Sequence, residues 1–224
     1  TIVPHTSPDG DAIGSTLGLY HFLKNQGHDV QVIAPTDFPD FLKWMPAADQ
    51  ILIYPNGESK AQQRIAASSL IFTLDFNNLL RAKPLTALLE QSQADFVMVD
   101  HHQQPDTYAK ITYSDDKASS TCELIYKVIT ALSSEQAINQ DIATCLYTGI
   151  MTDTGGFRFS MTSPETHRIV ATLLEKGANC TEIASEVLDS YSLDRLLLLG
   201  HVLNDLTYLP QYRTAYMYIS SKTL

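Results

Sequence analysis

The order of hydrophobic and polar positions predicts strands that alternate with helices over the first half of the chain. Short apolar runs rich in β-branched residues are typical of strands, and a helical pattern over residues 12–25 separates the first two. The expected strands cover residues 1–4, 30–34, 51–54, 70–74, 96–99 and, as an edge strand, 108–113. Such alternation predicts an α/β fold with a mostly parallel central sheet flanked by helices.

The second half of the chain has helical patterns, expected over residues 120–132, 135–147, 164–176 and 181–188. Ser120 with Glu123, and Ser163 followed by Pro164, have the spacing of helix starts. Apolar positions over residues 192–206 predict a linker helix with one apolar side. The segment 213–219 alternates like a strand for which no partner is evident, so it is expected to begin a second, smaller domain.

The predicted domain organisation follows from these patterns. Residues 1–190 form the catalytic domain, residues 191–210 a connecting helix, and residues 211–224 the first strand of a C-terminal substrate-binding domain. At 224 residues and 44% hydrophobic content, one sizeable core is expected. No stretch approaches the roughly 20 apolar residues that cross a bilayer, so no membrane partner is expected.

Cysteine content and net charge limit the expected cellular compartment and the expected class of substrate. Cys122, Cys145 and Cys180 are odd in number and far apart, and no signal peptide is visible, which favours reduced thiols and a cytoplasmic location. The net charge of −10 is unsuited to a long duplex nucleic acid, since phosphate tracking needs many cations. Two divalent cations would add +4 and bring the charge to −6, which still favours short substrates.

Ionisable side chains follow several apolar runs directly. They are His5, Asp9 and Asp11 after the first strand, Asp75 after residues 70–74, Asp100, His101 and His102 after residues 96–99, and Asp153 in a turn after residues 145–151. Because ligands bind outside the carboxyl ends of parallel strands, these groups are expected to share one crevice. Carboxylates packed so closely repel each other, so a cation is expected between them.

The type of ligand indicates which cation. Carboxylate oxygens with one or two imidazoles and no thiolate suit Mn²⁺, and Mg²⁺ less well because it seldom takes nitrogen. Each group alone has a plainer interpretation: a D-x-D in a loop is most often a turn or helix cap, and a lone Asp75 at a strand end is usually solvated. Asp-His-His directly after an apolar strand, together with the other groups, favours a metal site.

Five segments taken together resemble the DHH phosphoesterase superfamily, named for the triplet Asp100-His101-His102. They are HTSPDGDAIGS at 5–15, LDFNN at 74–78, VDHH at 99–102, ASSTCELIY at 118–126 and GIMTDTGGFRFS at 149–160. In detail they look most like the subgroup of oligoribonucleases (nanoRNases) that also remove phosphate from 3′-phosphoadenosine 5′-phosphate, which is related to RecJ-type exonucleases. The resemblance implies a two-metal phosphoesterase acting on short RNA or a nucleotide.

The resemblance also implies roles for individual residues. One metal ion is expected on His5, Asp9 and Asp75, and another on Asp11, Asp75, His101 and Asp153, with Asp75 bridging the two. Apart from the resemblance, the position of Asp100 beside a ligand favours a hydrogen bond that orients a ligand imidazole, with a simple turn residue as the alternative. His102 is hypothesised to contact the scissile phosphate and to help protonate the leaving oxygen, with a packed imidazole as the alternative.

Two further groups are candidates for contacts to substrate phosphate, each with a plainer alternative. Arg158 lies five residues after Asp153, and an arginine that binds its own loop is the alternative. Ser119, Ser120 and Thr121 stand at the head of an expected helix, where capping is the alternative.

Several functions remain open. Within the same chemistry the chain could be an inorganic pyrophosphatase of the DHH type or a phosphodiesterase of cyclic dinucleotides, and from another class a catalytically silent nucleotide-binding regulatory module. A dinucleotide-dependent oxidoreductase and a P-loop kinase are disfavoured, since neither G-x-G-x-x-G nor G-x-x-x-x-G-K occurs. A homodimer is an open alternative for the assembly.

Overall fold

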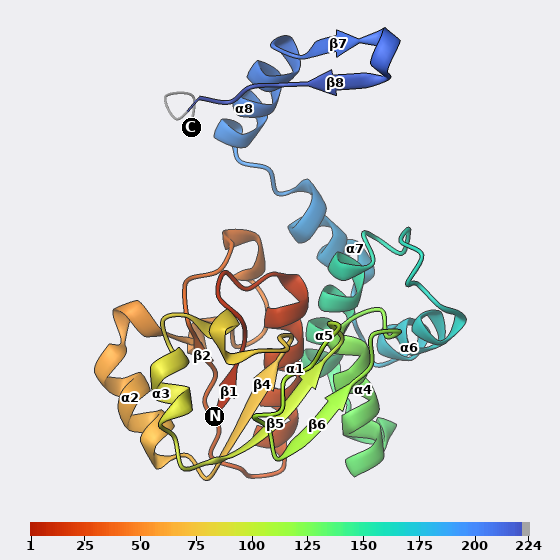
Figure 1. The fold of residues 1–224 in the computed structure, drawn as a ribbon. Coiled ribbons are helices and arrows are strands. Elements are labelled where there is room, and N and C mark those ends of the chain that lie inside the picture. The colour runs from red at the N-terminus through yellow and green to blue at the C-terminus, as the bar shows by residue number, and fades with distance from the viewer. Residues whose placement is uncertain (221–224) are drawn as a thin grey trace. The chain divides into compact units, whose positions relative to one another are not determined.

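The structure, a computed structural model, describes residues 1–220. The chain divides into two units, and a parallel sheet forms the centre of the first (Figure 1). This unit is Thr1–Val187. Its central strands have the order β1-β4-β5-β6, with bounds Ile2–Val3, Leu70–Leu74, Asp95–Asp100 and Ile111–Ser114, and all three pairs are parallel. The predicted α/β class with a mostly parallel sheet is confirmed.

A second parallel pair extends this sheet. β2 (Ile33–Ala34) pairs with β3 (Leu52–Ile53), and an isolated bridge between Ile2 and Val32 joins this pair to β1. The carboxyl ends of all these strands therefore lie at one edge of the sheet.

Helices cover both faces of the sheet, which is why its strands are apolar on both sides. On one face lie α1 (Gly10–Asn25), α4 (Thr121–Leu132) and α5 (Gln140–Asp153), with the larger core cluster. On the other face lie α2 (Glu58–Ala67) and α3 (Thr86–Glu90), with a separate cluster. Neighbouring strand residues divide between the faces: Ile2 belongs to the first cluster and Val3 to the second.

The other elements are short. They are α6 (Pro164–Glu175), α7 (Cys180–Ala184), a π-helical segment Ser185–Asp189, and the 3-10 turns Asp40–Leu42, Ala48–Gln50, Tyr54–Asn56, Leu79–Ala82, Glu135–Ala137 and Pro210–Tyr212. The predicted helix start at Ser163 is confirmed, since its hydroxyl accepts from the Thr166 N–H in a capping box.

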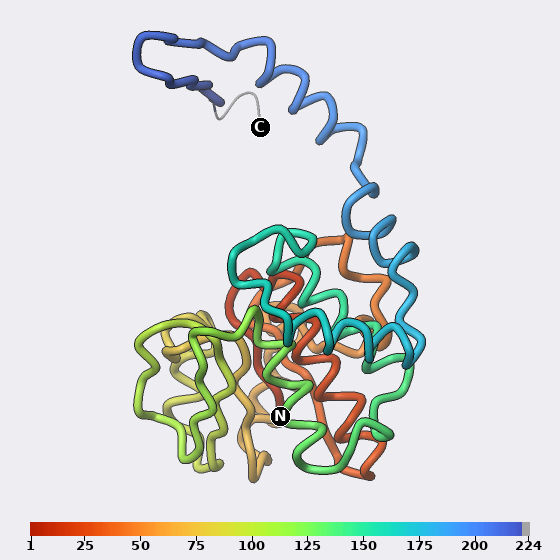
Figure 2. Tube along the Cα trace, turned by 90° about the vertical axis from the view of Figure 1, so that its right-hand side faces the viewer, coloured from red at the N-terminus to blue at the C-terminus, as the bar shows by residue number. Residues whose placement is uncertain are grey.

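The contact between α1 and α5 depends on glycine. These two helices, far apart in the sequence, lie side by side in the first unit (Figure 2). A Cβ atom at Gly14 would lie 2.5 Å from the Cys145 carbonyl oxygen of α5. One at Gly149 would lie 3.1 Å from the Asp11 Cα atom of α1 and 2.2 Å from the Cys122 Sγ atom of α4. The backbones approach this closely only because both side chains are absent.

The position of α5 corrects two predictions. The helix expected over residues 135–147 begins instead at Gln140, because the Asn139 side chain caps it by accepting from the Ile142 N–H. It continues to Asp153, which is therefore the last residue of a helix and does not lie in a turn. The helix ends there because Gly155 and Gly156 take positive φ angles of 58° and 70°.

The second unit begins at Leu188 and contains α8 (Leu193–Asn204), β7 (Thr207–Leu209) and β8 (Thr214–Tyr216). β7 and β8 pair antiparallel, so the expectation that the last strand lacks a partner was wrong. The partner lies inside the range 191–210 expected as one helix, which ends at Asn204. The predicted domain boundaries stay a prediction, and residues 221–224 lie outside the described residues. In the part of the chain that the structure describes, no helix combines the length and apolarity needed to cross a membrane.

Candidate metal centre

The turn from β1 into α1 supplies three of the predicted ligands. His5 follows the strand and is buried. Asp9 is the N-cap of α1, and its Oδ1 atom accepts from the backbone N–H groups of Asp11 and Ala12, both at 3.1 Å. Asp11, in the first turn of the helix, points inward and is 1% exposed. The cap and the first turn thus carry two carboxylates of very different exposure.

The neighbouring strands β4 and β5 supply the next group. Leu74 pairs with Val99, so Asp75 and the segment from Asp100 to His101 leave the sheet side by side. Asp75 adopts a positive φ of 66°, a left-handed conformation that aspartate tolerates better than most residues. Asp75 is 2% exposed, and its two carboxylate oxygens lie near His5 and His101.

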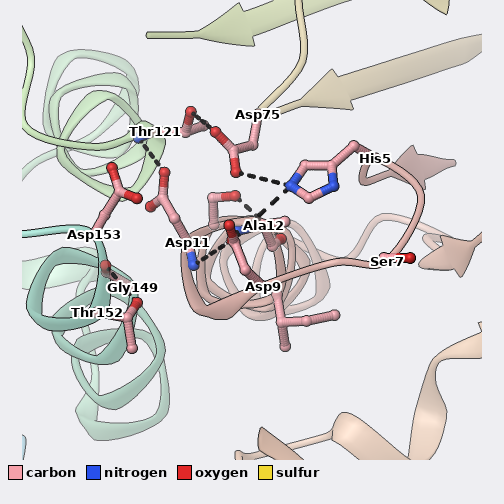
Figure 3. Close-up of polar contacts among 12 residues, drawn as sticks. His5, Ser7, Asp9, Asp11, Ala12, Asp75, Thr121, Gly149, Thr152 and Asp153 are labelled. Atoms are coloured by element: carbon pink, nitrogen blue, oxygen red, sulfur yellow. Dashed lines mark hydrogen bonds and ion pairs between the residues drawn. The ribbon is translucent and has the colours of Figure 1, made fainter. Parts of the chain in front are cut away.

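These side chains fall into three groups of potential ligand atoms among the described residues: His5, Asp9 and Asp75; Asp11, His101 and Asp153; and Asp75, His101 and His102. Figure 3 shows His5 and the four carboxylates of the first two groups. In the His5 group (His5, Asp9, Asp75), the His5 Nε2 atom lies 3.4 Å from Asp75 Oδ2 and 3.9 Å from Asp9 Oδ1. In the Asp11 group (Asp11, His101, Asp153), the His101 Nε2 atom lies 3.4 Å from Asp153 Oδ2 and 3.9 Å from Asp11 Oδ2.

Asp75 faces both groups with different oxygen atoms. Its Oδ2 atom is the one near His5, whereas its Oδ1 atom lies 3.5 Å from His101 Nε2. Within each group the ligand atoms all lie within 4.8 Å of one another. The structure therefore brings together all six residues expected to bind metal, from β1, α1, β4, β5 and α5; their role as ligands stays a proposal.

The carboxyl groups of this centre are electrostatically strained. Burial, together with the charges of Asp75 and Asp153, raises the pKa of Asp11 well above its usual range. Burial, together with Asp75 and Asp9, raises the pKa of Asp153 to about 6. Burial also acts to raise the pKa of Asp75, but the neighbouring imidazoles, His5 first, outweigh it and lower that pKa. A cation is the natural counter-charge for this arrangement.

The residues present fit divalent metal ions. The donors are carboxylate oxygens and imidazole nitrogens, without a thiolate, and the clustered atoms face one another across a space of ionic size. The nearest thiol, Cys122, contributes no ligand atom to these groups, and burial followed by the charge of Asp11 raises its pKa.

Asp100 and His102 form a pair beside the centre. Asp100 is fully buried, and its Oδ1 atom accepts from His102 Nδ1 at 2.7 Å. The Asp100 Oδ2 atom is buried and has no hydrogen-bond partner among residues 1–220. Asp100 was expected to orient a ligand imidazole, and its hydrogen bond goes to His102. The His102 Nδ1 atom lies 3.7 Å from Asp75 Oδ1, and His102 is itself a potential ligand in the group with Asp75 and His101, so the role of Asp100 stays a prediction.

The residues expected to contact phosphate have protein partners. The Ser119 hydroxyl donates to Glu123, and the Ser120 hydroxyl caps α4 by accepting from the Glu123 N–H. Thr121 is bonded to Asp11 and Asp75. Arg158 is exposed and its Nε atom donates to its own loop at the Gly155 carbonyl. Contact of these residues with a substrate phosphate stays a prediction.

Arg81 is a residue near the centre that the sequence patterns did not single out. Its backbone oxygen accepts from the Thr6 N–H at 2.7 Å, which ties the turn after β4 to the loop after His5. The hydrogen bond to Asp100 is the main cause that raises the pKa of His102, and the positive charge of Arg81 acts to lower this pKa. The only signal in the sequence was an arginine six residues after Asp75, which could have marked Arg81 as close to the centre.

Comparison with known proteins gives a consistent relationship. The pattern described as "DHH family, N-terminal domain" matches residues 1–150. The "Bifunctional oligoribonuclease and PAP phosphatase NrnA" of Thermus thermophilus is 31% identical over 186 residues, which are 83% of this chain and 52% of that protein. The chain thus spans about half the length of this relative.

Two solved structures are also similar. An exopolyphosphatase-related protein from Bacteroides fragilis matches with a TM-score of 0.96 at 41% identity, over 99% of this chain and 65% of that one. A putative family II inorganic pyrophosphatase from Methanococcus jannaschii matches with a TM-score of 0.65 at 18% identity, over 96% of this chain and 68% of that one, which shows the fold alone. The family pattern over residues 1–150 and the Thermus relative confirm the resemblance found in the sequence, and the chain belongs to the DHH family.

Proposed function

We propose that this chain is the metal-binding part of a phosphoesterase that hydrolyses short oligoribonucleotides and 3′-phosphoadenosine 5′-phosphate. The observation that carries the proposal is the division of Asp75 between two ligand groups, with one carboxylate oxygen toward each. The name of the Thermus relative, an oligoribonuclease and PAP phosphatase, supports the choice of substrate.

In this proposal His5, Asp9 and Asp75 hold one divalent ion, and Asp11, Asp75, His101 and Asp153 hold the other. Manganese fits the mixture of carboxylate and imidazole ligands best, and magnesium is the second choice. When bound, two such ions polarise the phosphoryl oxygens and lower the pKa of the attacking water.

His102 is proposed to supply the proton for the leaving oxygen. Asp100 accepts from its Nδ1–H, which fixes the tautomer and leaves Nε2 to carry the exchangeable proton. Through this hydrogen bond first, and despite partial burial, Asp100 and Asp75 raise the pKa of His102. A larger fraction of the imidazole is therefore protonated near neutral pH, as a general acid requires.

A second candidate is hydrolysis of a phosphoanhydride such as polyphosphate or pyrophosphate. The Bacteroides structure, described as exopolyphosphatase-related, is the observation that favours it. The same ligand groups serve both reactions, because each is an in-line attack of water on phosphorus.

The test compares substrates on the full-length protein supplied with manganese. Release of product from a ribodinucleotide, 3′-phosphoadenosine 5′-phosphate, pyrophosphate and short polyphosphate is measured side by side, with Asp75→Asn as the inactive control. The proposal expects the first two to have the highest kcat/KM. Preference for polyphosphate or pyrophosphate would establish the second candidate in its place.

A further inference from the structure

The first turn of α4 is bonded to two of the proposed metal ligands. The Thr121 N–H donates to Asp11 Oδ2 at 2.6 Å, and the Cys122 N–H donates to Asp11 Oδ1 at 2.9 Å. The Thr121 hydroxyl donates to Asp75 Oδ1 at 2.9 Å (Figure 3). The first backbone N–H groups of a helix usually donate to water or to a capping side chain. Here they donate to the carboxylate of Asp11, and the neighbouring Thr121 hydroxyl donates to Asp75.

The bond from Thr121 limits how Asp75 can turn. A carboxylate rotates over a broad range about its last torsion, and such rotation would exchange or misplace its two oxygens. The Thr121 hydroxyl occupies one acceptor direction of Oδ1 and holds that oxygen toward His101. The other oxygen, Oδ2, is left toward His5.

Thr121 differs in this respect from Thr16 and Thr148, two other buried threonines in helices. The Thr16 hydroxyl donates to the Ile13 carbonyl and the Thr148 hydroxyl to the Thr144 carbonyl, both within their own helix. Thr121 stands at the first helical position, and its hydroxyl reaches a residue 46 positions away in the sequence. Its side chain is fully buried, so this bond is made in the protein interior, where unmet polar groups are costly.

We infer that Thr121 is a positioning residue that orients the shared carboxylate of Asp75, while the backbone at its position and at Cys122 fixes Asp11. The start of α4 then sets the relative placement of the two metal ions. This inference rests on the proposed two-metal function.

The test measures metal binding by the metal-free protein, independently of activity. Manganese is titrated by calorimetry into the wild type, Thr121→Val, Thr121→Ala and Thr121→Ser. Removing the hydroxyl is expected to weaken binding by about tenfold or more, the range for groups that orient metal ligands. The serine variant keeps the hydroxyl and is expected to stay within about threefold of the wild type. Thr16→Val makes the same chemical change at another buried site and is expected to bind as the wild type does.

Melting temperatures of the metal-free proteins separate positioning from packing. A merely structural role would lower the melting temperature of Thr121→Val without changing the manganese affinity of the folded protein, and this result would overturn the inference. Equal weakening in Thr121→Ser and Thr121→Val would also overturn it, because the hydroxyl would not be responsible. Failure of the proposed function looks different: there the wild type itself binds no manganese.

Discussion

The two ligand groups contain the same residue types but balance their charge differently. In the His5 group, the Asp9 side chain is 61% exposed and Asp75 raises the pKa of His5, although burial opposes this. Solvent and a more basic imidazole thus offset the carboxylates. In the Asp11 group the Asp11 side chain is fully buried, and the pKa values of Asp11 and Asp153 are both raised. That group depends on a proton or a metal ion for its charge balance.

This difference indicates unequal roles for the two proposed ions. An ion in the Asp11 group replaces protons on buried carboxyl groups and is expected to exchange slowly. An ion in the His5 group lies beside an exposed carboxylate and is expected to exchange faster. Two sites with similar ligands can therefore differ in ion binding, because burial determines the free-energy cost of leaving the carboxylates without a metal ion.

The largest effect is expected at Asp75, whose two oxygen atoms lie near His5 of one group and His101 of the other. Asp75→Asn should lower kcat/KM by about a thousandfold or more, since metal ions contribute several kcal/mol to such reactions. Asparagine tolerates the left-handed backbone at this position, so the fold should persist. Activity and metal content are measured beside Asp95→Asn, an exposed carboxylate at the opposite end of β5. If Asp75→Asn kept both ions and full turnover, the proposal that Asp75 binds both ions would be wrong.

The next effect concerns His102, which lies beside the Asp11 group. His102→Ala should lower kcat about a hundredfold, the low end for loss of a general acid, while both ions remain bound. Turnover and manganese content are determined on the same sample. His102 Nδ1 lies only 3.7 Å from Asp75 Oδ1, so loss of a manganese ion from His102→Ala would show that His102 is a metal ligand and not a general acid.

A matched pair of variants tests the inequality of the groups directly. Asp9→Asn and Asp153→Asn should each weaken one of the two ions by between about tenfold and a hundredfold, but not the same ion. The ion that remains in Asp9→Asn should exchange slowly and that in Asp153→Asn quickly, as measured by displacement with labelled manganese. Equal exchange rates in the two variants would contradict the comparison.

The smallest effect is the dependence on pH. Burial first, then Asp75 and Asp9, raise the pKa of Asp153 to about 6, so a proton competes with metal below that pH. Manganese affinity of the Asp11 group should fall about fivefold between pH 6 and pH 5 through this one proton, as measured by calorimetry.

The same pKa shift has a consequence for the metal-free protein. The folded state holds the Asp153 proton more tightly than the unfolded state, so this group destabilises the fold as pH rises through about 6. The melting temperature of the metal-free protein should therefore drop more between pH 5 and pH 7 in the wild type than in Asp153→Asn. An identical drop in both proteins would show that Asp153 does not titrate in this range.

The sequence was most informative where apolar strands run directly into charged residues. Asp75 and His101 could be placed at neighbouring strand ends because parallel strands align their carboxyl ends. Asp153 was harder, since a helix that ends at two glycines resembles a strand followed by a turn. The hydrogen bond from Thr121 to Asp75 could not be predicted, because it depends on how α4 docks against β4.

The second unit illustrates another limit. β7 and β8 have three residues each, too few to show a period of two, and β7 follows directly on the apolar positions of α8. Strand pairing over so short a range is set by the turn between the strands, where Arg213 takes a positive φ of 48°.

The glycine contacts between α1 and α5 make the width of the Asp11 group adjustable in one direction only. A Cβ atom at Gly14 would lie 2.5 Å from the Cys145 carbonyl oxygen of α5, so a methyl group there is expected to push the two helices, and with them Asp11 and Asp153, apart. A wider cage suits a larger cation, so Gly14→Ala should shift ion preference from magnesium toward calcium, whose bonds to oxygen are longer. The ion preference of the proposed site is in that sense expected to depend on a helix contact made three residues after Asp11.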